Sequence, residues 1–597
     1  MRFKSRKTNG YVVYAVSGVN TISFAIDPSG GANISGLLGF AVEREDLVEN
    51  EKYFMTNFKV FKEIIPDPGP ETAVTTFDHP VQSFVWDDFT AKPGYRYNYY
   101  FYPVKGKPKN LKREKPVKIS VVTEKITDTK QKHDVFFNRG VASSQAYARR
   151  FNNLAPEKIP DPARRQEAYK WLGRDLPAAM LSFIEQARKG DTLLACVYEF
   201  RYLPVVQAFK AAIDRGVNVR IVMDAKANAG DFPRKDNLDT VRAAGLPPEN
   251  IRLREARQTD IQHNKFIVYI EGKSSRPRAV WTGSTNISEG GIFGQTNVGH
   301  WVRDAEVAEK FRKYWELMQT DPGGRAGESR DVVKQKNTTF KQAVEAIQQD
   351  LDPLDLNRIP NGVTVIFSPR LKDTMLDVYG ALLDRADQLS CITLAFGVSD
   401  KFKELLRDNT PASHMTFLLL EKEDTPDKKE KEGNTFLRLN ASHNVYSAFG
   451  SFLEEPLYQW ARETNTGLLK LNHHVQYIHS KFLLSDPLGS QPIVVTGSAN
   501  FSVSSTTDND ENMILVKGDQ RVADIYFTEF NRLFFHYYFR SVYNKLGDAA
   551  SPDSMFIKTD AEEWLSKYVP GSLKHKRIQV FANMKGAVTR NFKSLPA

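Results

Sequence analysis

The sequence predicts an α/β protein in which one α/β domain occurs twice, preceded by an all-β domain. Three observations support this prediction: short alternating strands before residue 125, alternating apolar strands and amphipathic helices after residue 130, and a second copy of that order about 200 residues later. A chain of 597 residues has the length for several such domains.

Residues 1–125 are expected to form a β-sandwich. A turn at Pro93-Gly94 precedes a strictly alternating run, residues 95–99, which indicates a half-buried antiparallel strand. Several such strands within about 120 residues are typical of a sandwich, and the stretch resembles fibronectin type III and immunoglobulin-like domains. A fold-level resemblance of this kind implies no function.

The two α/β repeats are expected at residues 130–325 and 355–545. The apolar runs at 192–200 and 389–397 read as strands buried on both faces, and each is followed by an amphipathic helix and another apolar strand. We therefore expect two mixed sheets flanked by helices. An irregular linker is expected near 320–355, where Gly and Pro interrupt the pattern, and residues 546–597 read as a basic C-terminal tail.

The charge pattern indicates a phosphate-bearing partner. The net charge is +10, and no acidic residue follows Glu563. A second basic cluster spans residues 105–118. Such clusters attract nucleic acid or anionic lipid, although a solvated surface that aids solubility is the alternative. Cys196 and Cys391 lie in apolar runs and are expected to be buried free thiols, which favours a cytoplasmic protein, with peripheral contact to an anionic membrane as a further option.

Each repeat carries the same motif at the same relative place. The first has His263-Asn264-Lys265 and then Gly-Ser284-Thr-Asn286; the second has His479-Ser-Lys481 and then Gly-Ser498-Ala-Asn500. Residues i and i+2 of a strand point to one side, so each His-x-Lys directs an imidazole and an ammonium group at one spot. Lysines and amides can bind the oxygens of a phosphodiester, while one histidine attacks phosphorus and the other protonates the leaving oxygen.

These motifs resemble those of the phospholipase D superfamily, His-x-Lys-x4-Asp followed by Gly-Ser-x-Asn, over about residues 130–545. The resemblance implies a two-step displacement through a phosphohistidine, without a metal or other cofactor. It also implies a structural role for the motif aspartate, Asp486, and places Glu511 as the carboxylate that accepts a hydrogen bond from the histidine of its own repeat, His479.

The first repeat departs from this pattern twice. Ile270 stands at the position of the motif aspartate, and Gln295-Thr296-Asn297 stands where the second repeat has Asp510-Glu511-Asn512. The partner of His263 is therefore open, with Glu199 as a candidate on position alone. The resemblance implies that His263 is the nucleophile and His479 the acid and base, and the asymmetry leaves the reverse assignment open.

Both halves of the site lie on one chain, so a monomer is expected to suffice for the active site. We expect hydrolysis or head-group transfer on phospholipids. A nuclease of the same superfamily, cleaving DNA or RNA, is the first alternative, because both substrates present the same phosphodiester. A binding or scaffold protein that has lost catalysis is the second, and the two intact His-x-Lys pairs argue against it.

Overall fold

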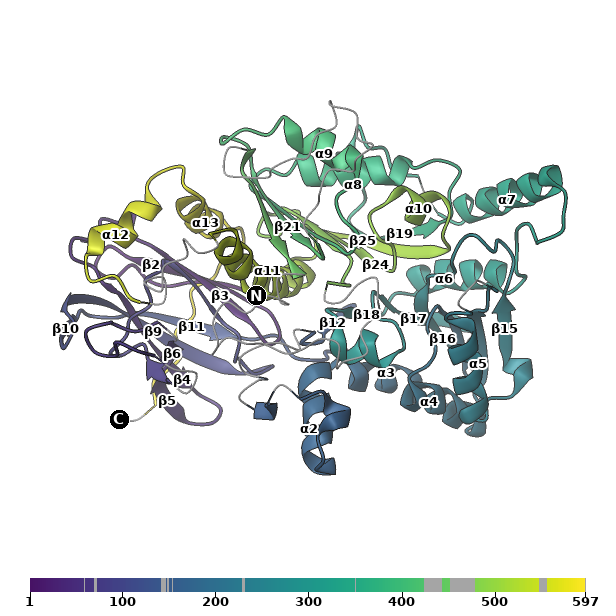
Figure 1. Cartoon of the computed structure of the whole chain (residues 1–597), viewed down its shortest axis with the longest axis horizontal. Coiled ribbons are helices and arrows are strands. Elements are labelled where there is room, and N and C mark those ends of the chain that lie inside the picture. Colours follow the sequence, from purple (N-terminus) through teal and green to yellow (C-terminus); the bar gives the residue numbers. More distant parts are fainter. Residues whose placement is uncertain are drawn as a thin grey trace.

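A computed structural model describes the chain except for 58, 69–71, 141–146, 148–149, 153, 228–230, 349, 423–442, 451–477, 547–555 and 596–597. Figure 1 shows an all-β unit on one side of the molecule and two α/β units on the other, with the long helix α11 between them. The mixed α/β class and the leading all-β region are both as predicted.

The all-β unit consists of two antiparallel sheets. The first sheet has the order β1 (Arg2–Lys4), β2 (Val12–Ser17), β3 (Ile22–Asp27), β8 (Val85–Asp88). The second has the order β10 (Asn110–Arg113), β9 (Arg96–Lys107), β4 (Gly39–Asp46), β5 (Glu51–Phe54), and β11 (Val117–Val122) also pairs with β9. In addition, β6 (Thr56–Asn57) and β7 (Val74–Thr75) pair antiparallel as a separate two-stranded sheet. Phe24 of the first sheet packs on Tyr99 and Phe101 of the second, with ring centroids 4.7 and 5.3 Å apart, so the two sheets enclose a shared core.

The first α/β unit is built on a seven-stranded mixed sheet. Its order is β12 (His133–Phe137), β18 (Val298–Val302), β17 (Arg276–Gly283), β16 (Lys265–Glu271), β13 (Thr192–Val197), β14 (Asn218–Asp224), β15 (Ile251–Arg254). The neighbours β13, β14 and β15 are parallel, and every other pair is antiparallel.

The second α/β unit repeats this sheet strand for strand. Its order is β19 (Gly362–Ser368), β25 (Glu511–Lys517), β24 (Ile493–Gly497), β23 (Phe482–Ser485), β20 (Leu389–Leu394), β21 (Met415–Leu420), β22 (Val445–Phe449). Parallel and antiparallel pairs fall at the same places. The duplication predicted from the order of apolar runs is therefore confirmed.

Helices cover both sheets. The first repeat has α2 (Pro162–Gly173), α3 (Leu176–Glu185), α4 (Leu203–Asp214), α5 (Arg234–Ala243), α6 (Ala305–Met318), the short turns η1 (Pro156–Lys158) and η2 (Pro248–Asn250) and the π-helical turn η3 (Gly290–Gly294). The second has η4 (Leu356–Arg358), α8 (Thr374–Asp384), α9 (Asp400–Arg407) and α10 (Val503–Thr507). Between them, α7 (Arg330–Glu345) occupies much of the expected linker. Ser329 caps α7, whose Phe340 and Val344 are buried, so this segment is an ordered amphipathic helix.

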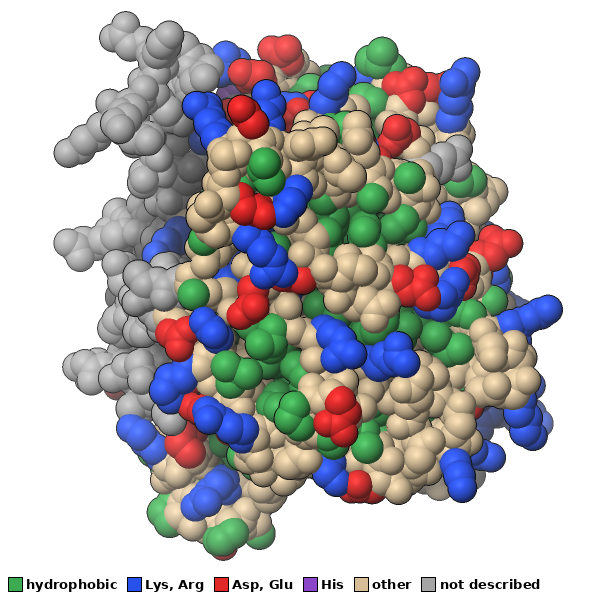
Figure 2. Space-filling view, turned by 90° about the vertical axis from the view of Figure 1, so that its right-hand side faces the viewer, with side chains coloured by type: hydrophobic (Ala, Val, Ile, Leu, Met, Phe, Trp, Pro, Cys, Tyr) green, Lys and Arg blue, Asp and Glu red, His purple; other side chains and the backbone are tan. Residues whose placement is uncertain are grey.

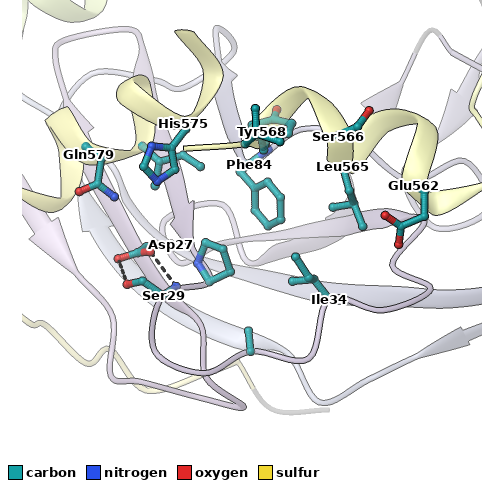
Figure 3. A pocket seen from close by; sticks show the side chains of 14 residues that line it. Asp27, Ser29, Ile34, Phe84, Glu562, Leu565, Ser566, Tyr568, His575 and Gln579 are labelled. Atoms are coloured by element: carbon teal, nitrogen blue, oxygen red, sulfur yellow. Dashed lines mark hydrogen bonds between the residues drawn. The ribbon is translucent and has the colours of Figure 1, made fainter. Parts of the chain in front are cut away.

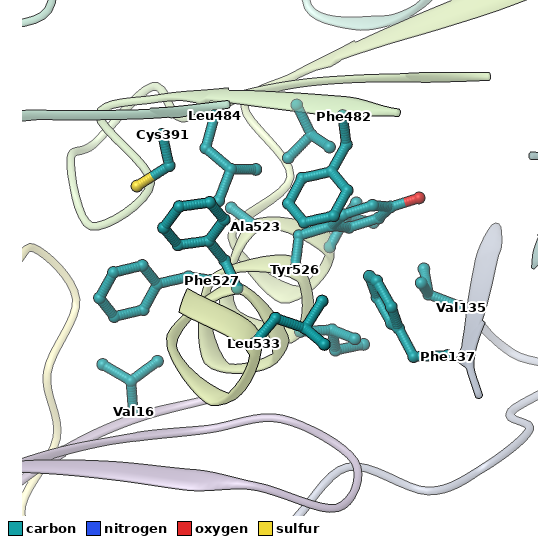
Figure 4. Packing of buried hydrophobic residues seen from close by; sticks show 14 of the residues in the cluster. Val16, Val135, Phe137, Cys391, Phe482, Leu484, Ala523, Tyr526, Phe527 and Leu533 are labelled. Atoms are coloured by element: carbon teal, nitrogen blue, oxygen red, sulfur yellow. The ribbon is translucent and has the colours of Figure 1, made fainter. Parts of the chain in front are cut away.

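Helix α11 (Gln520–Leu546) joins the three units. Tyr526 contacts Phe137 of the first repeat and Phe482 of the second, at centroid distances of 5.2 and 5.3 Å. In Figure 4, Cys391 and Leu484 of the second sheet lie on one side of this helix and Val16 of the sandwich on the other. Both cysteines are free and buried, as predicted. No described helix is both long and apolar enough to cross a membrane.

The end of the chain packs on the sandwich and does not extend as the expected basic tail. It forms α12 (Ala561–Leu565), η11 (Ser566–Tyr568) and α13 (Leu573–Ala582). Trp564 is buried and its indole N–H donates to the carbonyl of Leu37 at 2.8 Å. Val588 forms a β-bridge with Phe3. Apolar residues interspersed among the lysines drive this packing, and the charge count alone concealed them.

Candidate active site at the seam between the repeats

The two His-x-Lys motifs meet where the repeats exchange short β-bridges. Gln262 pairs with Asp510, and Thr296 pairs with Ile478. The backbone N–H of His263 donates to the Asp510 carbonyl at 2.9 Å, and the N–H of Asp510 donates to the Ile261 carbonyl at 2.9 Å. Each histidine is therefore held against the strand that follows the Gly-Ser-x-Asn turn of the other repeat.

His263 takes its carboxylate partner from the second repeat. Its Nδ1 lies 3.0 Å from both oxygens of Glu511, which is fully buried. A carboxylate accepts hydrogen bonds, so Nδ1 carries the proton and Nε2 keeps its lone pair for chemistry. The expectation that Glu511 serves His479 is therefore wrong, because the exchange of strands across the seam places it on the other ring.

His479 takes an amide partner from the first repeat. Its Nδ1 donates to Oδ1 of Asn297 at 2.9 Å. Asn297 is the structural equivalent of Glu511: Ser284 donates to Asn297 at 2.8 Å as Ser498 donates to Glu511 at 2.6 Å, and both pairs are 13 residues apart. The orienting position in the first repeat is thus filled by an amide, one residue beyond the position that we aligned with Glu511.

Glu199 is not the partner of His263. Its carboxylate accepts from Nδ2 of Asn286 at 3.2 Å and pairs with Arg201 at 3.1 Å. Tyr198, the residue before it, instead contacts the ring of His263 at a centroid distance of 5.1 Å and lies 5.5 Å from Nζ of Lys265. Nothing in the motifs singled out this tyrosine, since it precedes them by more than 60 residues.

Both lysines are buried and turn back toward their own histidines. Nζ of Lys265 donates to the carbonyl of His263 at 2.6 Å, and Nζ of Lys481 donates to that of His479. Burial lowers the pKa of Lys265 to about 7, against the opposing effect of Glu511 and Glu199. Burial, with repulsion from Lys265, lowers the pKa of Lys481 well below its usual value. An incoming phosphate would relieve both penalties.

The two imidazoles share this basic environment. Their ring centroids are 6.5 Å apart, within reach of a single phosphoryl group. Burial and the neighbouring ammonium groups lower the pKa of His263 and of His479 well below 6.5. Burial raises the pKa of Glu511 to about 7. Neutral imidazoles, one of them oriented by a carboxylate, suit nucleophilic attack.

The predicted phosphate-binding residues divide into two groups. Ser284 and Ser498 are fully buried and orient Asn297 and Glu511, so these hydroxyls act behind the histidines. The Oδ1 atoms of Asn286 and Asn500 are buried and have no hydrogen-bond partner among the described residues. Buried polar atoms without partners are rare, so these two amides mark where a polar group of a substrate fits.

The motif aspartate of the second repeat is remote from the histidines. Asp486 accepts hydrogen bonds from the backbone N–H groups of Asp387, Gln388 and Leu389. In the first repeat the equivalent carboxylate is Asp191, which lies at the start of the opposite strand, β13. It accepts from the N–H of Gly272 at 2.8 Å and from that of Arg188 at 2.8 Å. The carboxylate missing at Ile270 is thus supplied from across the strand pair. A signal was present, since Asp191 directly precedes an apolar strand.

Behind Glu511, a buried ion cluster fixes the seam. Asp510 pairs with Nε of Arg254 at 2.9 Å and with Arg257 at 3.2 Å, and Arg254 also pairs with Asp321 at 2.8 Å. Arg254 and Asp510 are fully buried. The described ranges contain no group of three or more His, Cys, Asp or Glu placed to hold a metal ion.

Comparison with known protein families gives a match in both repeats. A family model described as "Cardiolipin synthase, PLD-like domain" matches residues 180–318 and 440–534. No curated protein sequence matches.

Three solved structures show distant similarity. A phosphatidylserine synthase from Haemophilus influenzae Rd KW20 has 11% identity, covering 68% of this chain and 93% of its own, with a TM-score of 0.39. Yeast tyrosyl-DNA phosphodiesterase has 13% identity over 56% and 83%, with a TM-score of 0.30. The phospholipase D family member Nuc from Salmonella typhimurium has 26% identity over 24% and 84%, with a TM-score of 0.19.

The repeated seven-stranded sheet and the paired His-x-Lys motifs at its seam define a two-repeat α/β protein with one composite site. The family match falls in both repeats, so each repeat contains a region similar to the PLD-like domain.

Proposed function

We propose that the chain is a metal-independent phosphodiester hydrolase that works through a phosphohistidine on His263. The carrying observation is the unequal pairing of the two rings: His263 faces a carboxylate at 3.0 Å and His479 faces an amide at 2.9 Å. A carboxylate stabilises the positive charge that the attacking ring acquires, whereas an amide leaves the second ring able to release its proton.

The reaction then has two balanced steps. The bound anionic phosphodiester offsets the two ammonium groups, so His479 takes up a second proton, on Nε2. Nε2 of His263 then attacks phosphorus, the bond to the leaving oxygen breaks, and His479 donates this Nε2 proton to that oxygen. His479 next removes a proton from water, whose oxygen attacks phosphorus and breaks the P–N bond. Lys265 and Lys481 hold the phosphoryl oxygens during both steps, and the Nδ2 groups of Asn286 and Asn500 can donate to the same oxygens.

For the substrate we propose a phospholipid. A pocket of about 280 Å³ lies beside Asn500 and is lined mainly by apolar side chains, Leu394, Ala395, Phe396, Val398, Phe501 and Val503. Phe396 is 63% exposed, and Asp400 is the charged residue of this lining. The described lining of this pocket contains no cation for the next phosphate of a nucleic-acid strand, whereas an apolar or neutral group would be well accommodated.

The surface charge on one side of the molecule also favours a phospholipid over a nucleic-acid substrate. Figure 2 shows the face on which α5 and α7 lie, and there basic and acidic side chains are interspersed. A continuous basic track, which a nuclease needs to bind a strand, is absent from the described residues on this face. A nuclease remains the competing outcome of the test.

The substrate test is a side-by-side assay of purified protein, with a chelator present, on labelled phospholipid vesicles and on single- and double-stranded nucleic acid. We expect release of head group, and loss of nearly all turnover in His263→Ala and in His479→Ala. Turnover of nucleic acid alone would replace the lipid assignment, and dependence on added metal would contradict the mechanism.

The intermediate is tested with a phosphodiester of p-nitrophenol, whose leaving group needs no proton. In His479→Ala the first step should release nitrophenolate as a burst and the second should stall, so acid quench and mass spectrometry should find the phosphoryl group, still carrying its second ester, on the His263 peptide. His263→Ala is the control and should show neither burst nor adduct. An adduct on the His479 peptide in the unmodified protein would reverse the two roles.

A further inference from the structure

A cluster of lysines lies far from the histidines, where the end of the chain packs on the β-sandwich. Lys59 follows β6, Lys567 lies on η11 and Lys574 lies in the first turn of α13. The bridge between Val60 and Phe556 holds the first segment against the C-terminal segment, and the three ammonium groups lie near enough to repel one another. Lys59 and Lys574 are half-buried, and Lys567 is exposed.

These lysines lack counter-charges. Within the described part of the chain, no carboxylate forms an ion pair with Lys59, Lys567 or Lys574; the nearby pair joins Lys558 to Glu563 at 3.1 Å. Burial, with repulsion from Lys567, Lys59 and Arg577, lowers the pKa of Lys574 to about 8. Burial, with repulsion from Lys567 and Lys558, also lowers the pKa of Lys59. Like charges held together at such a cost suggest a missing anion.

The position of Lys574 adds to this imbalance. The N-terminal turn of a helix carries partial positive charge and free backbone N–H groups, so it favours anions and disfavours a lysine. Ser572 caps α13 through the N–H of His575, and Nζ of Lys574 lies over the ring of Tyr568 at 5.1 Å. The ammonium group is therefore held where an anion fits best.

We propose that Lys59, Lys567 and Lys574 bind the phosphate groups of an anionic lipid surface and so hold the enzyme on a membrane. Two neighbouring features favour lipid over nucleic acid. Val569, in the loop between Lys567 and α13, is 54% exposed and presents an apolar side chain beside the lysines. Basic residues next to an exposed apolar side chain are typical of peripheral membrane contacts.

The second feature is an adjacent cavity of about 450 Å³ that Val569 also lines. Figure 3 shows Phe84, Ile34 and Leu565 in its middle, with Asp27 and Glu562 at opposite ends. The apolar side chains in the middle of this cavity suit acyl chains of a lipid surface better than the charged backbone of a nucleic-acid strand. The proposal is independent of the chemistry at the histidines, so either can fail alone.

The test is co-sedimentation of the full chain with vesicles of neutral lipid, with and without an anionic phospholipid. Lys567→Glu/Lys574→Glu should weaken binding to anionic vesicles by more than about 25-fold at low salt, since each lysine near an anionic surface contributes roughly fivefold. Lys273→Glu/Lys313→Glu is the matched control, because it makes the same change in net charge at exposed sites of the first repeat. His263→Ala should bind as the unmodified protein does.

Lys574→Met is a second variant that controls for misfolding, because it removes the charge and keeps an unbranched side chain over Tyr568. Without vesicles, we expect this variant to have an equal or higher Tm. Its binding to anionic vesicles should be about fivefold weaker. The affinity of the unmodified protein should fall as pH rises past about 8, and that of the variant should not. Equal binding by cluster and control variants would overturn the proposal. So would a loss of nucleic-acid binding in the cluster variant with vesicle binding unchanged.

Discussion

At the scale of single residues, the difference between Glu511 and Asn297 makes the site directional. The two repeats supply the same backbone position, the same serine donor and the same hydrogen bond to a histidine, and they differ in one charge. Because the strands are exchanged at the seam, the acid encoded in the second repeat serves the histidine of the first.

This difference leads to a prediction for Asn297→Asp. A carboxylate at this position would stabilise protonated His479, so its pKa should rise and the general acid should persist to higher pH. The alkaline limb of the profile of kcat/KM against pH should move up by about one pH unit or more. The matched variant Glu511→Gln should instead lower kcat by about 100-fold or more. An unchanged alkaline limb in Asn297→Asp would show that His479 is not the acid.

Lys265→Met should remove most activity and stabilise the protein. The pKa of Lys265 is lowered to about 7 in the folded chain, from 10.5. Between these values the unfolded chain binds more protons, so the stability of the unmodified protein rises with pH in this window. The methionine variant should be the more stable at pH 7 and lose that dependence between pH 7 and 9. Urea unfolding at the two pH values measures this, and a destabilised variant would show that the ammonium group supports the fold.

At the scale of elements, the cluster of Asp510 and Arg254 holds the start of β25 against the first repeat. Arg254→Leu leaves Asp510 buried with a weakened set of partners, and we expect a loss of about 3–5 kcal/mol in unfolding free energy. The exposed pair of Arg242 and Asp239 provides the control, because Arg242→Ala should change stability by less than about 1 kcal/mol. Denaturant unfolding of both variants measures these changes. Equal effects would show that the cluster does not stabilise the seam.

The elements themselves were largely predictable, because a strand covered on both faces must be apolar throughout. The runs at β13, β20 and β21 met that condition and were found by it, and β14 met it except at the exposed Asn218 and Arg220. Helix α7 was missed because the Gly-rich turn before it and its polar surface suggested a linker. Only Phe340 and Val344 of this helix are buried.

The site divides in the same way. His-x-Lys and Gly-Ser-x-Asn are local patterns, so the sequence predicted which side chains gather. The partner of each ring depends on a strand exchange between segments 248 and 182 residues apart, and no local pattern encodes that. The structural aspartates are a third case. Asp191 directly precedes β13 in the first repeat, whereas Asp486 directly follows β23 in the second. The two repeats therefore place this carboxylate on opposite strands of the equivalent pair.

At the scale of the whole molecule, the C-terminal segment is part of the sandwich. A chain ending at residue 555 loses Trp564, Ile578 and Phe581 from a core that includes both sheets. We expect such a chain to bind a hydrophobic dye and to unfold at a lower temperature than the full chain. Scanning calorimetry and dye binding measure this, and an unchanged Tm would show that the sandwich is complete without its last helices.

The bridge between Phe3 and Val588 has a consequence for synthesis. The sandwich strands leave the ribosome well before the residues that cover them. At translation rates of about 5–20 residues per second, roughly half a minute to a minute and a half passes between synthesis of the sandwich strands and synthesis of α12 and α13. During that interval their apolar surface is open to chaperones and to neighbouring nascent chains. Expression at low temperature, or with extra chaperone, should therefore raise the yield of soluble protein.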